Sequence, residues 1–145
     1  MIFDKTLQFS DAQAITATAI STNIVDTLAT GTVYGAAAAL SKDIGKGCKI
    51  PVLIQVVEDF NTLTSLTVDI RFSAAEGMGS PKIVQSQTIA LADLKAGKTI
   101  SIDCVPPGAD LRYMAVNYTV TGTDPTTGKV TAGIVMAVQT NGADF

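Results

Sequence analysis

Two segments near the C-terminal end of the chain constrain its fold more than any other feature. Residues 113–120 and 130–138 each alternate apolar side chains with small or polar ones. Alternation with a period of two residues places successive side chains on opposite faces of a β-sheet. Residues 121–128, between the two segments, are rich in Thr, Gly, Asp and Pro, which favour turns. The pattern predicts a hairpin of two antiparallel strands, which needs a second apolar layer because an isolated hairpin is only marginally stable.

Further strand patterns account for most of the remaining chain. The segment at 50–57 (IPVLIQVV) is apolar on both faces, which is typical of a strand covered on both sides or lying at an interface. Residues 91–95 predict one helical turn, ended by Gly97. We therefore expect a single all-β domain spanning residues 1–145, a jelly roll or β-sandwich of about eight antiparallel strands with very little helix. Besides the hairpin, strands are expected at residues 14–20, 50–57, 66–72, 83–89 and 99–105.

Residues 29–49 break this pattern. Four glycines punctuate the segment, and the alanine-rich run at 36–40 is too short to form a stable helix by itself. Its low charge suggests that it packs against this fold or against a neighbouring molecule. The segment is predicted to be an irregular excursion, or arm.

The composition narrows the choice of partners. Charged residues make up 16% of the chain, below the roughly 25% of an average soluble domain. A domain with so little charge can hide surface in an oligomer or a larger assembly, so we expect a homodimer, with a trimer as the alternative. The net charge of −3 provides no basic surface for nucleic acid or for an anionic membrane. The start of the chain lacks a signal-peptide pattern, and no apolar run approaches the roughly 20 residues of a membrane span, so synthesis in the cytoplasm is expected.

The residue types argue against catalysis. The chain contains no histidine, which excludes Ser-His-Asp and Cys-His catalysis and imidazole-based metal sites. Residues 122–129 (GTDPTTGK) imitate a phosphate-binding loop, but the spacing is one residue too long and a strand follows where a helix is required. We therefore expect no enzymatic activity, no cofactor and no metal.

The two cysteines, Cys48 and Cys104, show no metal or redox spacing and are expected to be free thiols. Cys104 has the same alternation phase as Ile100 and Ile102, so it is predicted to be buried.

A further pattern extends over most of the chain, in the segments 9–26, 43–47 (DIGKG), 54–60 (IQVVEDF) with 66–73, 94–102, and 112–123 with 128–135. Taken in order, these segments resemble the small capsid cement (decoration) proteins of short-tailed bacteriophages. The resemblance implies a jelly-roll fold on the outside of the viral shell, where the protein clamps neighbouring major capsid subunits, and it implies no catalytic residue. Residues 28–40 depart from the family pattern and look like an insertion.

The function expected from the sequence is therefore structural: a cement protein on the virion capsid exterior, bound to the major capsid protein and to itself. The alternative is a jelly-roll carbohydrate-binding or host-adhesion module, and a jelly-roll enzyme is the third option, opposed by the absence of histidine. Self-association is expected through residues 50–57 or the C-terminal hairpin. The candidate partner-binding residues are Thr32, Val33, Tyr34, Ile50, Val52 and Ile54.

Overall fold

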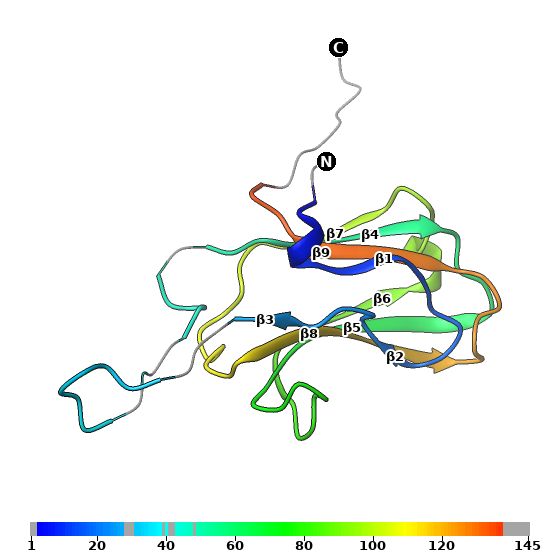
Figure 1. Cartoon of the computed structure of the whole chain (residues 1–145). Coiled ribbons are helices and arrows are strands. Elements are labelled where there is room, and N and C mark those ends of the chain that lie inside the picture. The colour runs from blue at the N-terminus through cyan, green and yellow to red at the C-terminus, as the bar shows by residue number, and fades with distance from the viewer. Residues whose placement is uncertain (1–2, 28–30, 39, 41–42, 48, 138–145) are drawn as a thin grey trace, which may run out of the picture.

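A computed structural model describes residues 3–27, 31–38, 40, 43–47 and 49–137, which form a sandwich of two antiparallel sheets (Figure 1). These residues contain nine strands and two short 3-10 helices. None of the described helices has the length and hydropathy needed to cross a bilayer. The elements are η1 (Lys5–Leu7), β1 (Gln8–Ala14), β2 (Ala19–Ile20), β3 (Val25–Asp26), β4 (Val52–Glu58), β5 (Leu63–Ser73), β6 (Lys82–Ala90), η2 (Leu91–Asp93), β7 (Thr99–Ile102), β8 (Tyr113–Gly122) and β9 (Lys129–Ile134).

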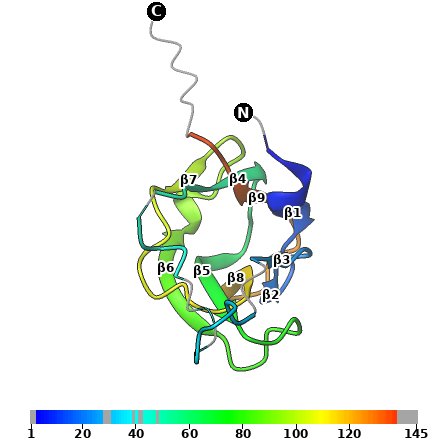
Figure 2. The ribbon, with the colours of Figure 1, turned by 60° about the vertical axis from the view of Figure 1, so that its left-hand side comes forward.

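The strand order identifies the sandwich as a jelly roll. One sheet has the order β1-β9-β4-β7, and the other has the order β2-β8-β5-β6, with β3 also paired to β8. The first strand thus pairs with the last, β2 and β3 with β8, β4 with β7, and β5 with β6, which is the pairing produced by rolling up one long antiparallel ribbon. Viewed from the turned direction, the strands surround one interior (Figure 2). The predicted all-β fold is confirmed.

The core lies between the inward faces of the two sheets. In the β5–β8 ladder, Val68 lies opposite Tyr118 and Ile70 opposite Val116, and all four side chains are fully buried. In the other sheet, Ile54 of β4 lies between Ile100 and Ala132. Each fully buried aliphatic side chain contributes about 1.5–3 kcal/mol relative to exposure, so these matched rows stabilise the sandwich.

The predicted hairpin is wrong, because β8 and β9 belong to different sheets. β8 pairs with β5, and β9 pairs with β1 and β4. The connecting loop crosses between the sheets and is held by Asn61, whose Oδ1 accepts hydrogen bonds from Thr126 N (2.9 Å) and Thr127 N (3.2 Å). Alternation determines which face each residue occupies, but it does not identify the neighbouring strand.

The first strand also differs from the expectation. A strand was predicted at residues 14–20, whereas β1 spans Gln8–Ala14 and β2 contains only two residues. Ser10 of β1 is buried inside the sandwich, where its hydroxyl is 2.8 Å from the Tyr118 hydroxyl and donates to Gln13 Oε1 (2.7 Å). These hydrogen bonds satisfy the serine, so a polar residue occupies an inward position without an unpaired group.

Cys104 is exposed, so its predicted burial is also wrong. β7 ends at Ile102, and the alternation shifts by one residue beyond it. Val105 takes the next buried position, and its N–H donates to the Ile50 carbonyl (3.1 Å). Cys48 lies outside the described residues.

Candidate interaction arm

The connection between β3 and β4 carries a segment that projects from one end of the sandwich (Figure 1). Its described residues, 31–38 and 40, are called the arm here. Leu40 N donates to the Gly31 carbonyl (2.8 Å), and Ala36 N donates to the Val33 carbonyl (2.9 Å). The arm therefore folds back on itself as a narrow loop, which brings its two ends together.

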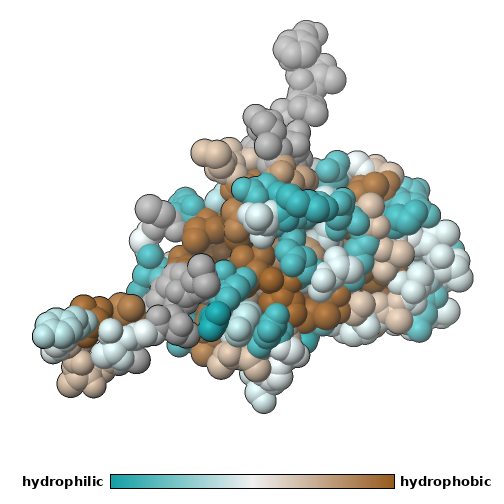
Figure 3. Space-filling view, in the orientation of Figure 1, coloured by the Kyte–Doolittle hydropathy of each residue, from teal (hydrophilic) through white to brown (hydrophobic). Residues whose placement is uncertain are grey.

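The arm exposes apolar side chains. Seven large hydrophobic side chains are exposed among the described residues, and three of them are Val33 (56%), Tyr34 (104%) and Leu40 (55%). Brown, hydrophobic atoms are visible on the arm, which stands away from the body of the molecule (Figure 3). Exposed apolar groups gathered at a projection are typical of a surface that another molecule covers.

One root of the arm is fixed by a bidentate ion pair. Asp26 of β3 accepts hydrogen bonds from Arg112 Nε (2.9 Å) and Nη2 (2.7 Å). Thr27 N donates to the Arg112 carbonyl (2.9 Å), and the guanidinium carbon lies 5.1 Å from the centre of the Tyr113 ring. A planar fork that engages both carboxylate oxygens constrains orientation as well as distance, so the chain leaves β3 in a defined direction.

The other root is fixed by Asp43. Its Oδ2 accepts from Gly108 N (2.8 Å), and its Oδ1 accepts from Gly45 N (3.0 Å) and Ala109 N (3.1 Å). The hydrogen bond from the Gly108 amide is the largest cause that lowers the pKa of Asp43, and those from Gly45 and Ala109 lower it further. A Cβ at Gly45 would overlap the Pro106 carbonyl, so only glycine permits this close approach.

Both roots meet on one segment, residues 106–112, which leads into β8. Asp43 binds the backbone at Gly108 and Ala109, and Asp26 binds the Arg112 side chain. The arm is therefore attached at two points to the end of a central strand. The two anchors therefore fix the chain on both sides of the arm, at Asp26 and at Asp43.

The six sequence-predicted partner-binding residues fall into two groups. Thr32, Val33 and Tyr34 are exposed on the arm, and Ile50 is half-buried against the core. Val52 and Ile54 are fully buried, on the inward face of β4. These two side chains pack inside the domain and cannot contact a partner in the folded protein.

The apolar pattern of residues 50–57 therefore has an internal explanation. β4 lies between β9 and β7, with both edges paired. Leu53 lies on the outward face of β4 and is nevertheless fully buried. It lies opposite Gly133 of β9. The Phe3 ring covers this glycine so closely that a Cβ added to Gly133 would be 2.8 Å from the ring.

The sequence reasoning missed Leu40, Asp43 and Arg112. The DIGKG segment was noted only for its resemblance, although an Asp two residues before a Gly is a pattern that binds backbone amides in turns. The sequence held no signal for the contact of Asp43 with residues 108 and 109, because that contact joins positions 65 and 66 residues apart.

Replacing Asp43 with alanine should loosen the arm root without unfolding the sandwich. Three backbone amides lose their acceptor, so hydrogen exchange at Gly108 and Ala109 should accelerate while exchange in β5 stays unchanged.

Acid should have the same effect on the natural protein. Because the folded pKa of Asp43 is lowered, its contribution is present above the unfolded value, near 4, and is lost as pH falls through the folded pKa. Unchanged exchange at both amides in the variant would show that Asp43 does not hold this root.

The described residues contain no group of three or more acidic, cysteine or histidine side chains that could hold a metal ion. What they define is a small jelly-roll domain with an anchored apolar arm. The chain belongs to the Bbp16 family, whose model matches residues 9–138.

Solved structures and curated sequences add little to this assignment. The crystal structure of PirA is similar at 13% identity and a TM-score of 0.38, covering 66% of this chain and 82% of PirA. The PBSX exported protein XepA is similar at 16% identity and a TM-score of 0.40, and the match covers 89% of this chain but only 39% of XepA. No curated protein matches the sequence.

Proposed function

We propose that this protein is a structural cement protein of a bacteriophage capsid, which binds the outer surface of the shell and stabilises junctions between major capsid subunits. The observation that carries the proposal is the anchored arm with its fully exposed Tyr34. The ordered resemblance to phage cement proteins and membership of the Bbp16 family support it. A clamp needs a folded body and a projecting segment, and the sandwich with its arm has this form.

The arm acts as the contact that enters a neighbouring subunit. A few buried anchors, often tyrosines, supply most of the energy of a typical interface, and the exposed Tyr34 has this character. A specific interface buries roughly 1,200–2,000 Å² in total, so the arm alone is too small. The end of the sandwich from which the arm projects supplies the remaining area, including half-buried Ile44, Ile50 and Leu111. Repetition around a shell multiplies these modest contacts.

Adding the purified protein to expanded shells that lack it should raise the temperature at which they burst. A ligand that binds only the intact lattice stabilises it by about 2.7 kcal/mol per site at a hundredfold excess over its Kd. Light scattering during heating, with and without added protein, measures the shift, and cryo-electron microscopy of the same particles locates the bound copies.

Failure to bind shells, together with binding to a glycan array, would replace the cement function with the adhesion-module alternative. A single fully exposed tyrosine is a poor sugar-stacking platform, since Tyr118 is buried and Tyr113 half-buried.

A further inference from the structure

The described part of the sandwich has four sheet edges, and three of them carry features that discourage further pairing. β7 has four residues, and β2 and β3 have two each. β1 has two register shifts against β9 and a positive φ of 46° at Ala12. β6 is different, because it runs for nine residues, Lys82–Ala90, and pairs only with β5. A long exposed edge presents a row of unpaired backbone groups that can template another strand.

β6 also lacks the charges that usually protect an edge. Lys82 is its one charged residue, and that side chain is directed to Asp110 at 2.9 Å. The register against β5 shifts between Gln85 and Ile83, so the regular part of the strand is its C-terminal portion. No hydrogen bond found within the described residues joins the β6 backbone to any strand other than β5.

The start of the regular portion reads the same in both directions. Its first three residues, 85–87, are Gln-Ser-Gln, which is symmetric about Ser86. We infer that β6 pairs antiparallel with β6 of a second copy about a two-fold axis at Ser86, joining two sheets into one continuous sheet. A two-fold interface uses the same patch on both subunits, so a segment that matches its own reverse is suited to it.

The cross-strand pairs among residues 85–87 are compatible. Gln85 would lie opposite the partner's Gln87, where the two side-chain amides can exchange hydrogen bonds. Ser86 would face its own copy, and no like charges would meet. The symmetry axis is perpendicular to the sheet. Residues that face the core in one copy therefore lie on the same side of the joined sheet as the core-facing residues of the other copy.

The positions of these residues against β5 confirm that they alternate as the pairing requires. Gln85 and Gln87 lie opposite Ile70 and Val68, which face the core. On the outward face, Ser86 Oγ donates to Asp69 Oδ1 at 2.6 Å. The Ser86 side chain is thus already bonded within its own sheet, and the dimer would be formed by backbone groups and the glutamines.

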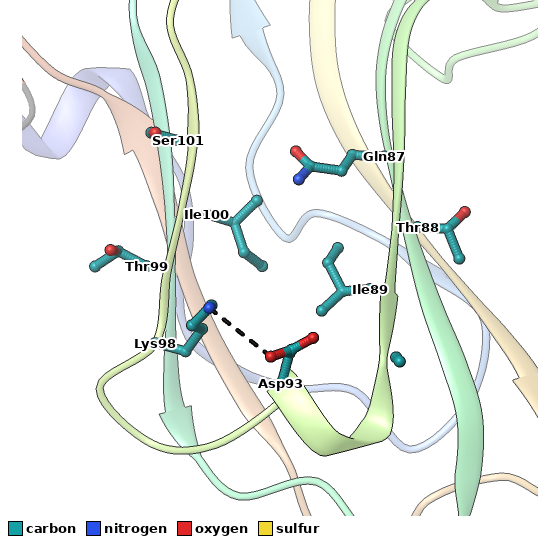
Figure 4. A pocket seen from close by; sticks show the side chains of 9 residues that line it. Gln87, Thr88, Ile89, Asp93, Lys98, Thr99, Ile100 and Ser101 are labelled. Atoms are coloured by element: carbon teal, nitrogen blue, oxygen red, sulfur yellow. Dashed lines mark ion pairs between the residues drawn. The ribbon is translucent and has the colours of Figure 1, made fainter.

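The space beside β6 is open. A cavity of about 500 Å³ lies between the edges of β6 and β7, with Gln87 and Ile89 on one side and Ile100 on the other (Figure 4). Thr88 points away from this cavity, and the Asp93–Lys98 ion pair (3.9 Å) lies at one end of it. Self-association was expected through residues 50–57 or the C-terminal hairpin, but β4, β8 and β9 are interior strands with both edges paired. They offer no edge to a second copy, whereas β6 does.

Sedimentation of the purified protein at about 100 µM tests this pairing without any shell. We expect twice the mass of one chain. In a variant with lysine at both Gln85 and Gln87, each introduced lysine would lie opposite an introduced lysine of the partner. The dimer dissociation constant should rise at least about a hundredfold, because juxtaposed like charges are strongly unfavourable. The matching double glutamate variant should be monomeric for the same reason.

Mixing the lysine and glutamate variants should restore a heterodimer, since every introduced charge then faces its opposite. This rescue separates a broken interface from a misfolded chain. Val57→Lys, at an exposed position on interior strand β4, should leave the dimer intact. A monomeric natural protein, an unaffected lysine variant, or a mixture that stays monomeric would each overturn the inference, and none of these results bears on whether single copies bind shells.

Discussion

Shells should lose most of their affinity for this protein when Val33 and Tyr34 are both replaced by serine. Neither side chain contributes to the core, and Tyr34 is 104% exposed, so the free domain should keep its melting temperature. An aromatic anchor that becomes buried at an interface typically contributes about 2–4 kcal/mol. At 1.4 kcal/mol per factor of ten, the expected loss is roughly 30- to 1,000-fold in Kd.

Met136→Ser is the matched control for this experiment. Met136 is 101% exposed, nearly the same as Tyr34, but it follows β9 and is not part of the arm. Co-sedimentation of each variant with shells over a range of concentrations measures the Kd values. If the arm variant binds as tightly as the natural protein while Met136→Ser binds weakly, the contact surface lies near the end of β9 and the arm has no role.

Truncating Phe72 to alanine should cost about 3–5 kcal/mol of unfolding free energy. Phe72 is fully buried, lies opposite Met114 and belongs to the same inward row as Ile70. The total free energy of unfolding of a natural domain is roughly 5–15 kcal/mol. The variant should therefore still fold, but it should unfold at a much lower urea concentration. Urea titration followed by circular dichroism should show a lower midpoint with an unchanged slope.

Val57→Ala provides the comparison for the core variant. Val57 lies on β4 but is 45% exposed, and such surface changes usually stay within about 0.5 kcal/mol. A Phe72→Ala variant as stable as Val57→Ala would mean that the β5–β8 face does not form the core of the folded protein.

The sequence predicted which face of its strand each residue occupies better than it predicted which strands pair with each other. The inward row of β5 and the inward row of β8 were both evident from alternation, because a residue's face depends only on its own strand. Pairing depends on loops that cross between sheets, and the loop after β8 is held by Asn61 from a distant segment. The burial of Ser10 likewise depends on Tyr118, 108 residues away, and no local pattern records it.

The candidate site was predictable only in part. The exposure of Val33 and Tyr34 agrees with the irregular, weakly charged segment around them, whose glycines and short alanine run discourage regular structure. Val52 and Ile54 were mistaken for contact residues because a strand buried inside a sandwich and a strand at an interface have the same composition. The anchors Asp43 and Arg112 depend on tertiary contacts and required the structure.

The two roots of the arm also determine how the domain bears mechanical load. Asp26 and Asp43 both attach to residues 108–112, immediately before β8. Tension that reaches these two anchors therefore acts on the end of β8, whose pairing with β5 extends from Leu63 to Ser73. Force directed along a strand loads many ladder hydrogen bonds at once instead of opening them one after another. The longest strand ladder among the described residues thus begins next to the two anchors of the arm.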